Sequence, residues 1–247
     1  MSSGSAGAEA SASPPDNLSL AARLGGVVRR PRPTFEAIAA APRPAAPLAL
    51  LFLVPFAMLA VFFATDVGRQ ALVDQWERTA IAFGQPVDDA RYDELKALSE
   101  RGTAYAALTA LLTGPVAAVA LATLLFTIFT GVRGGAAAYG QVLGVTAYAG
   151  VILVLRHIVS GPLNYARETM ASPSALVLFF TMVDEASPVA RFFGIIDVFV
   201  LWWLAVLAIG LSVIYGQPMR RFATQLVGAY AAIALLLAGT MAVLGAR

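Results

Sequence analysis

Asp197 is the first candidate for chemistry, because it is the only charge in the apolar stretch GIIDVFVLWWLAVLAIG, residues 194–210. One interpretation is structural: a carboxylate in the first turn of a helix meets the positive end of the helix dipole, and Arg191 is close enough in sequence to pair with it. The other is functional, since carboxylates inside a membrane commonly relay protons or bind ions. The place of Asp197 in the fold decides between the two.

A row of threonines is the second candidate. At about 100° per residue on one helix, five of them fall within an arc of ~100°: Thr109, Thr113, Thr123, Thr127 and Thr130. A stripe of hydroxyls can line a polar path across a membrane. Threonines in such helices also bond to the carbonyl four residues earlier and permit close helix packing. Packing is the interpretation that we favour.

Residues for catalysis or metal binding are scarce. The sequence has no cysteine and a single histidine, His157, which argues against a zinc-type site. Ser160 follows three residues later, but one helix end cannot supply an oriented base, a nucleophile turn and an oxyanion hole together. The sequence also lacks an HExxH motif and a phosphate-binding glycine loop. We therefore predict no enzymatic activity and no cofactor.

The composition identifies a membrane protein. Apolar residues make up 59% of the chain and charged residues 13%, whereas soluble domains carry about 25% charged residues. We predict an all-α, polytopic bundle of five transmembrane helices, at residues 45–65, 104–130, 139–159, 195–215 and 222–244. Pro55 and the pair Gly114-Pro115 predict kinks in the first two spans. Residues 174–183 are apolar but too short to cross, which predicts an interfacial or re-entrant segment.

Two further segments precede this membrane domain, which we place at residues 45–247. Residues 1–17 are rich in serine, alanine and glycine and predict a disordered tail without a signal peptide. Residues 18–44 predict a basic amphipathic segment on the membrane surface, with Leu20, Leu24, Val27 and Val28 on one helical face. Thr34 is predicted to cap a second short helix there.

The basic residues predict the orientation. With the N-terminus in the cytoplasm, the inner segments hold three acids and eight arginines, at positions 23, 29, 30, 32, 43, 133, 220 and 221. The outer segments then hold nine basic and eleven acidic residues. This favours a cytoplasmic N-terminus and an outer C-terminus, and Asp197 then lies at the outer boundary. We expect six residues to face the anionic inner leaflet: Arg23, Arg29, Arg30, Arg32, Arg220 and Arg221.

Two pairs of glycines are candidates for close contacts between helices. Gly131 with Gly135, and Gly140 with Gly144, match the pattern of small residues that brings membrane helices close together. Gln141 lies at the cytoplasmic end of its span and needs a partner if it faces inward. The net charge of +2 is too small to suggest a nucleic-acid partner.

Three stretches resemble the Yip family of Ypt/Rab-interacting membrane proteins, in its bacterial branch. They are RLGGVVRRPRPTFEAIAAAPRPAAPL (23–48), GGAAAYGQVLGVTAYAG (134–150) and IIDVFVLWWLAVLAIGLSVIYG (195–216). The resemblance implies a protein that organises membranes and associates with other membrane proteins or with itself. The Asp-Leu-Tyr-Gly-Pro motif of the eukaryotic members is absent, which argues against a GTPase partner.

The functional expectation follows from these observations together. We expect a non-enzymatic scaffold or accessory subunit of a transport complex, and the alternative is a small-solute or ion transporter. Lys96 is the only lysine beside many arginines, alanines and glycines, a bias typical of GC-rich bacterial genomes. The expected location is therefore the inner membrane of a bacterium.

Overall fold

The computed structural model describes residues 19–179 and 188–244, and the predicted tail at 1–17 lies outside these residues. The described residues are helical, and no β-strand occurs among them beyond one isolated bridge. Five helices are long and apolar enough to cross a membrane: Ala45–Phe63, Gly102–Val132, Tyr139–Ala166, Val198–Tyr215 and Met219–Leu244. The prediction of an all-α bundle with five apolar spans is confirmed.

The second span is interrupted twice. It consists of α6 (Gly102–Leu111), a π-helical segment (Leu112–Val116), α7 (Ala117–Phe126) and a second π-helical segment (Thr127–Val132). The first interruption contains Pro115, which has no N–H to donate, so the predicted break takes the form of a widened turn. Gly114 lies there against the carbonyl of Leu51 on α3 (Ala45–Phe63), so the lack of a side chain lets the two backbones meet.

The third span is longer than the sequence predicts. It comprises α8 (Tyr139–Ala149) and α9 (Val151–Ala166), and α9 continues seven residues past the predicted end at Val159. Gly161 and Pro162 suggest a helix end, yet Gly161 instead gives room to Met58 of α3. The extension carries two polar side chains, Ser160 and Asn164, to a cavity inside the bundle.

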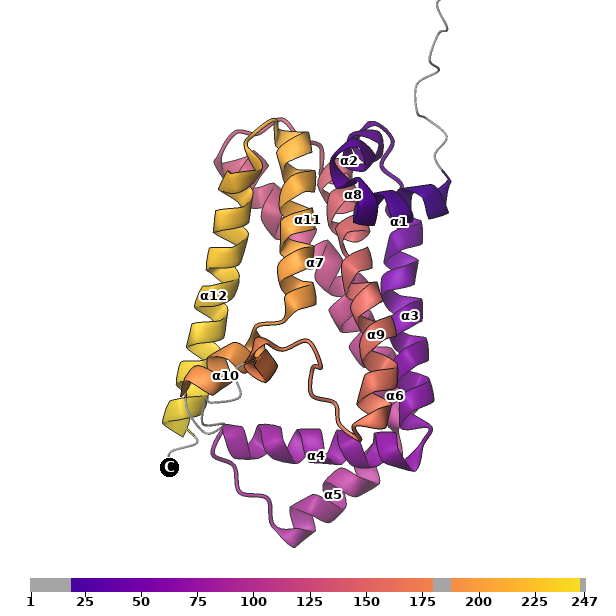
Figure 1. The fold of residues 1–247 in the computed structure, drawn as a ribbon, viewed down its shortest axis with the longest axis vertical. Helices are drawn as coiled ribbons and strands as arrows, with labels where there is room; N and C mark the ends of the chain where they lie inside the picture. The colour runs from indigo at the N-terminus through magenta and orange to yellow at the C-terminus, as the bar shows by residue number, and fades with distance from the viewer. Residues whose placement is uncertain (1–18, 180–187, 245–247) are drawn as a thin grey trace, which may run out of the picture.

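Short helices lie at both ends of the bundle (Figure 1). At one end are α1 (Leu20–Arg29) and α2 (Pro31–Ala40), together with the loops at 133–138 and 216–218. At the other end are α4 (Asp66–Ala82), α5 (Asp89–Ser99), α10 (Pro188–Ile195) and the end of α12 (Met219–Leu244). The predicted interfacial segment near residue 174 forms a short 3-10 helix, Leu176–Phe179, and its later residues lie outside the described part.

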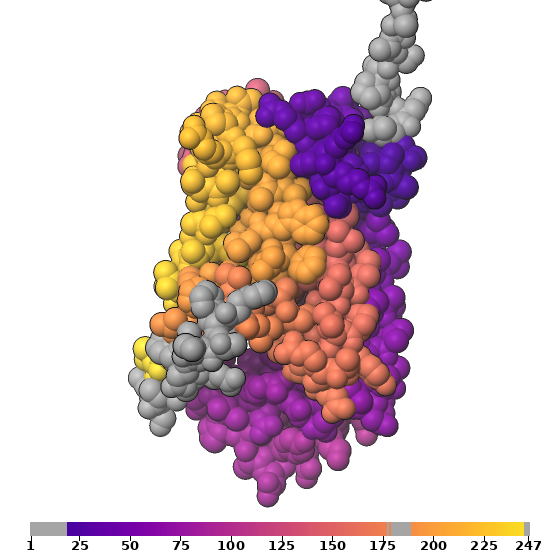
Figure 2. All heavy atoms as spheres, in the orientation of Figure 1, coloured from indigo at the N-terminus to yellow at the C-terminus, as the bar shows by residue number. Residues whose placement is uncertain are grey.

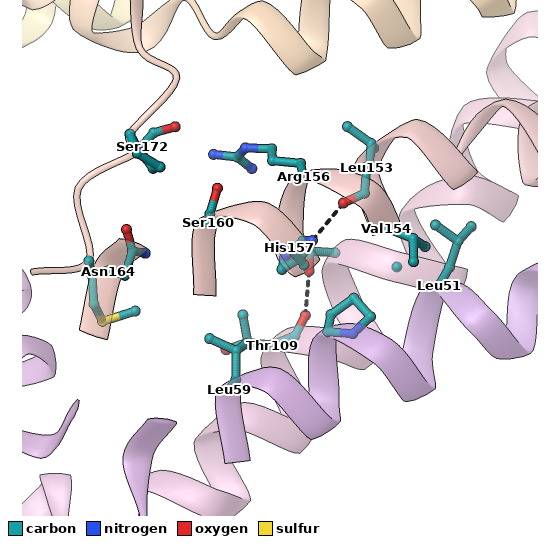
Figure 3. Close-up of a pocket in the computed structure, with 15 residues that line it drawn as sticks. Leu51, Leu59, Thr109, Leu153, Val154, Arg156, His157, Ser160, Asn164 and Ser172 are labelled. Atoms are coloured by element: carbon teal, nitrogen blue, oxygen red, sulfur yellow. Dashed lines mark hydrogen bonds between the residues drawn. The ribbon is translucent and has the colours of Figure 1, made fainter. Parts of the chain in front are cut away.

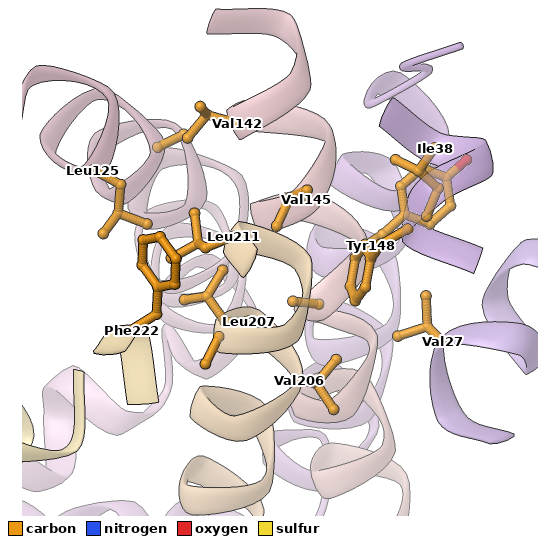
Figure 4. Close-up of a cluster of buried hydrophobic side chains, with 14 of the residues drawn as sticks. Val27, Ile38, Leu125, Val142, Val145, Tyr148, Val206, Leu207, Leu211 and Phe222 are labelled. Carbon is orange, nitrogen blue, oxygen red and sulfur yellow. The ribbon is translucent and has the colours of Figure 1, made fainter. Parts of the chain in front are cut away.

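The core centres on α8 and α11 (Val198–Tyr215). Val145, Tyr148 and Leu211 are fully or almost fully buried there and pack with Ile38 of α2 and Phe222 of α12 (Figure 4). A side chain on Gly210 would overlap Val145 and crowd Phe35, so this glycine sets how closely α11 approaches α8 and α2. The end with α1 and α2 is therefore the tightly packed end of the bundle.

The helices α1 and α2 cap this end of the bundle (Figure 2) and correct two predictions. Arg23, expected on the membrane surface, is 1% exposed, and its Nη1 donates to the carbonyl of Ala41 at 2.9 Å. Thr34 is not a cap but lies inside α2, where its hydroxyl donates to the carbonyl of Arg30 at 2.8 Å. The helix begins earlier because Pro31 takes the first helical position, which needs no N–H donor.

Candidate functional site

Asp197 is the residue immediately before α11 and caps it. Its Oδ1 accepts hydrogen bonds from the backbone N–H groups of Phe199, at 2.8 Å, and Val200, at 3.3 Å. These are two of the donors that a helix start leaves without an internal partner. The residue is only 3% exposed. The structural interpretation of Asp197, in which the carboxylate stabilises the start of a helix, therefore matches the geometry.

The other carboxylate oxygen of Asp197 binds side chains. Oδ2 accepts from Arg156 Nε at 3.0 Å, from the hydroxyl of Ser174 at 2.8 Å, and from the hydroxyl of Ser172. Arg156 comes from α9, so the ion pair joins the third and fourth spans. Arg191, which the sequence places within reach, is not the ion-pair partner.

The backbone around Asp197 is fixed as well. Leu176 N–H donates to the carbonyl of Ile196 at 2.8 Å, and Val198 N–H to that of Ser174 at 3.1 Å, so the two segments run side by side. The hydroxyl of Tyr230, on α12, donates to the carbonyl of Ile195 at 2.7 Å. Three spans and one connecting segment thus converge on this carboxylate.

The surroundings keep Asp197 ionised. Burial raises the pKa of the carboxyl, but the hydrogen bonds from Ser172 and Ser174 and the charge of Arg156 outweigh burial and lower the pKa below its ordinary value. Every strong acceptor position on the carboxylate is occupied by a protein donor. A carboxylate held in this way is suited to anchor helices and poorly suited to release and take up protons.

A cavity of about 310 Å³ lies beside the ion pair, between α3, the first π-helical segment, α9 and the chain at 170–173. Figure 3 shows Arg156, His157, Ser160 and Asn164 of α9 on one side and Leu51 and Leu59 of α3 on the other. The residues that line the cavity are Leu51, Pro55, Leu59, Thr109, Thr113, Gly114, Leu153, Val154, Arg156, His157, Ser160, Asn164, Met170, Ser172 and Pro173.

Several polar atoms around this cavity have no partner in the described chain. Ser160 Oγ and Asn164 Oδ1 are buried without a hydrogen bond. Arg156 uses only its Nε, so both Nη groups are free of hydrogen bonds to the described residues. The Nδ1 atom of His157 binds the carbonyl of Leu153 at 2.8 Å, which leaves Nε2 as the acceptor of a neutral ring. The cavity can therefore bind water or a small polar molecule.

The five threonines do not form one path. Thr109 and Thr113 line the cavity, and Thr113 donates to the carbonyl of Thr109 at 2.7 Å. Thr123 and Thr127 are exposed on the bundle surface. Thr130 pairs with the hydroxyl of Tyr215 at 2.9 Å. The common arc of the five threonines applies to a regular α-helix. The π-helical segments have wider turns, so residues after such a segment point in other directions than a regular helix would give.

In each of the two predicted glycine pairs, only one glycine lies close to another part of the chain. Gly135 lies against the ring of Tyr215 and Gly144 against Pro42, whereas no atom would lie within 4 Å of a side chain placed on Gly131 or Gly140. One glycine of each pair thus serves packing inside the chain.

The remaining candidates lie at the end with α1 and α2. The side chain of Gln141 accepts from Ala138 N–H and donates to the carbonyl of Ala39, both at 3.0 Å, which ties the start of α8 to the end of α2. Of the six arginines expected to face the inner leaflet, five are exposed at this end: Arg29, Arg30, Arg32, Arg220 and Arg221.

Sequence reasoning missed Arg156, although one signal was available: it is the only Asp, Glu, Lys or Arg between Tyr139 and Ala166. Its partner lies 41 residues away, so spacing alone could not connect the two. Among the residues that the structure describes, no three histidine, aspartate or glutamate side chains gather as metal ligands would.

Comparison with known proteins gives one match. A family model described as the Yip1 domain matches residues 25–241, which contains four of the five apolar helices and all but the last three residues of the fifth. No curated protein and no solved structure matches the chain.

Proposed function

Because the chain belongs to the Yip1 domain family of membrane proteins, we propose that it is a non-enzymatic scaffold or accessory subunit in a bacterial inner membrane. In this role it holds other membrane proteins, or copies of itself, in an assembly. The observation that carries the proposal is the large uncovered surface of α12.

The helix α12 lies along the edge of the molecule (Figure 2). Of the 26 residues in this helix, only Phe222, Ala234 and Ala238 are buried. Lipid alone can cover an apolar helix, but α12 also has a face on which another helix could pack. This surface is where a scaffold would hold its partner.

Two glycines distinguish this face. A side chain placed on Gly228 or Gly239 would meet no atom of the chain within 4 Å. They lie about 20° apart around the helix, so both face the same uncovered side of α12. Small residues at such positions let a second helix approach closely in the membrane.

Crosslinking of the full-length protein in native membranes tests the proposal. The wild type should crosslink to a second copy or to another membrane protein, and the double substitution Gly228→Leu and Gly239→Leu should abolish that product. Ala229→Leu is the matched control, because Ala229 is also exposed but lies about 100° away from Gly228 around the helix. A wild type that remains an isolated monomer would refute the scaffold role.

The proposed orientation places the end with α1 and α2 in the cytoplasm. Between residues 66 and 101, at the opposite end, eight acidic residues outnumber five basic ones. Glu36 is the only acid of the described inner segments, beside eight arginines. The difference supports a cytoplasmic N-terminus, since cytoplasmic loops carry the excess of basic residues.

A second candidate function, transport of a small solute or ion, is favoured by the polar cavity beside Arg156. If the cavity is a transport site, flux in reconstituted vesicles should fall when His157→Leu and Asn164→Leu remove its polar lining. Thr127→Val is the control, because Thr127 is exposed and lies outside the cavity. Flux that survives the loss of both cavity residues would reject transport through this site.

A further inference from the structure

A second hollow, which we call the basic pocket, lies at the opposite end of the bundle from Asp197. Its volume is about 290 Å³, near the lower limit of the range for ligand-binding pockets. It is lined by Phe129, Arg133, Gly134, Gly135, Ala136, Tyr215, Gln217, Arg221 and Phe222. Three spans meet here. The second span ends at Val132, the fourth ends at Tyr215, and the fifth begins at Met219. The pocket therefore lies at the level of the lipid headgroups.

Two arginines in the basic pocket carry uncancelled charge. Arg133 donates from Nη1 to the amide oxygen of Gln225, and Arg221 donates from Nη1 to that of Gln217, both at 3.1 Å. Both acceptors are neutral, and none of the lining residues, all of which belong to the described chain, is acidic. The remaining guanidinium N–H groups have no hydrogen-bond partner among the described residues. This differs from the cavity beside the ion pair, where Asp197 already neutralises Arg156.

The rest of the basic pocket is formed by packed aromatic rings and the start of a helix. The guanidinium carbon of Arg133 lies 5.1 Å from the centre of the Phe129 ring, which holds that side chain in place. Phe129 and Phe222 are packed with their ring centres 5.0 Å apart, so the floor of the pocket is apolar and fixed. The N-terminus of α12 also points here, and its dipole favours negative charge.

We propose that the basic pocket binds the phosphate of an anionic phospholipid headgroup. The two arginines bind the phosphate oxygens with charge-assisted hydrogen bonds, and the aromatic floor contacts the glycerol and the first methylene groups. Basic pockets between membrane helices are known to hold headgroups of this kind. The proposal goes beyond the scaffold role, and it does not depend on the surface of α12.

The test measures lipid binding to the full-length protein in a neutral detergent by native mass spectrometry. The probes are short-chain phosphatidylglycerol, short-chain phosphatidylcholine and inorganic phosphate. The wild type should bind phosphatidylglycerol at least about tenfold more tightly than phosphatidylcholine. Arg133→Gln and Arg221→Gln should each weaken phosphatidylglycerol binding about fivefold, as expected for one basic residue at an anionic headgroup.

Arg220→Gln is the matched control, because Arg220 is adjacent, equally charged and exposed but does not line the pocket. It should leave binding unchanged, and Arg221→Lys, which keeps the charge, should retain more affinity than Arg221→Gln. Equal loss in the Arg220 and Arg221 variants would overturn the proposal in favour of diffuse surface charge. Equal affinity for the two lipids, or binding of inorganic phosphate as tight as that of phosphatidylglycerol, would also overturn it. Thermal unfolding of each variant shows whether it is folded.

Discussion

Replacing Asp197 should destabilise the protein by an amount that depends on what replaces it. Asp197→Leu removes the cap of α11, which costs about 1 kcal/mol, and leaves Arg156 without its counter-ion. Stranding a buried charge costs ~3–5 kcal/mol, but the side chain of Arg156 is 32% exposed, so solvent reduces this part. We expect a total of about 3 kcal/mol.

Asp197→Asn should cost less, about 1–2 kcal/mol. Its amide oxygen can either cap the helix or accept from Arg156 and the two serines, but it cannot do both. Arg191→Gln is the control and should change stability by less than about 0.5 kcal/mol, because Arg191 does not pair with Asp197.

The assay is the free energy of unfolding in mixed micelles, measured for each variant and for a double-mutant cycle of Asp197→Leu with Arg156→Leu. The cycle should give a coupling energy of about 1–3 kcal/mol, as residues in one ion-pair network do. A coupling energy near zero would refute the claim that Asp197 and Arg156 stabilise the fold as a pair. A folded Asp197→Asn protein with the same loss of cellular function as Asp197→Leu would instead show that the carboxylate carries protons or ions.

Three further predictions concern other features of the fold. The stability that the Asp197 carboxylate contributes is present above the ordinary aspartate pKa and lost as the pH falls through its lowered folded pKa, so acid unfolding curves of the wild type and Asp197→Asn should converge in that range. A reporter protein that is active only in the cytoplasm should be inactive when it is fused after Arg247 and active when it is inserted in the loop at 216–218. The reverse pattern would show that the proposed orientation is wrong. Gly210→Val should cost about 1–3 kcal/mol of unfolding free energy because it overlaps Val145, whereas Gly140→Val should be close to neutral, and equal melting temperatures for the two variants would contradict this packing.

The spans could be predicted from sequence because each contains an apolar run long enough to cross a membrane. The end of the third span could not, because Gly161 and Pro162 are typical of a helix end. The cap at Asp197 could be predicted as well, since a carboxylate before an apolar run fits a helix start. Its partner could not, because Arg156 and Asp197 are 41 residues apart and are brought together only by the segment that connects the third and fourth spans. Hydropathy reports which residues avoid water, and it does not report which helices are neighbours.

The misplaced predictions have local physical causes. The arc that contains all five threonines assumes a regular helix, and two π-helical segments interrupt that helix at Leu112–Val116 and Thr127–Val132. Arg23 was expected on the surface, but the carbonyl of Ala41 at the end of α2 offers it an acceptor inside the fold. Both errors arise where the backbone departs from a regular helix or ends one.

The ion pair between Arg156 and Asp197 also sets an order of events during synthesis. Arg156 leaves the ribosome 41 residues before its partner, so the third span must enter the membrane carrying a guanidinium that has no counter-ion. A long arginine side chain near a span end can reach toward the aqueous interface in the meantime. The third span therefore reaches its final setting only when the fourth arrives, and in a chain that stops before Asp197 the charge of Arg156 lacks this partner.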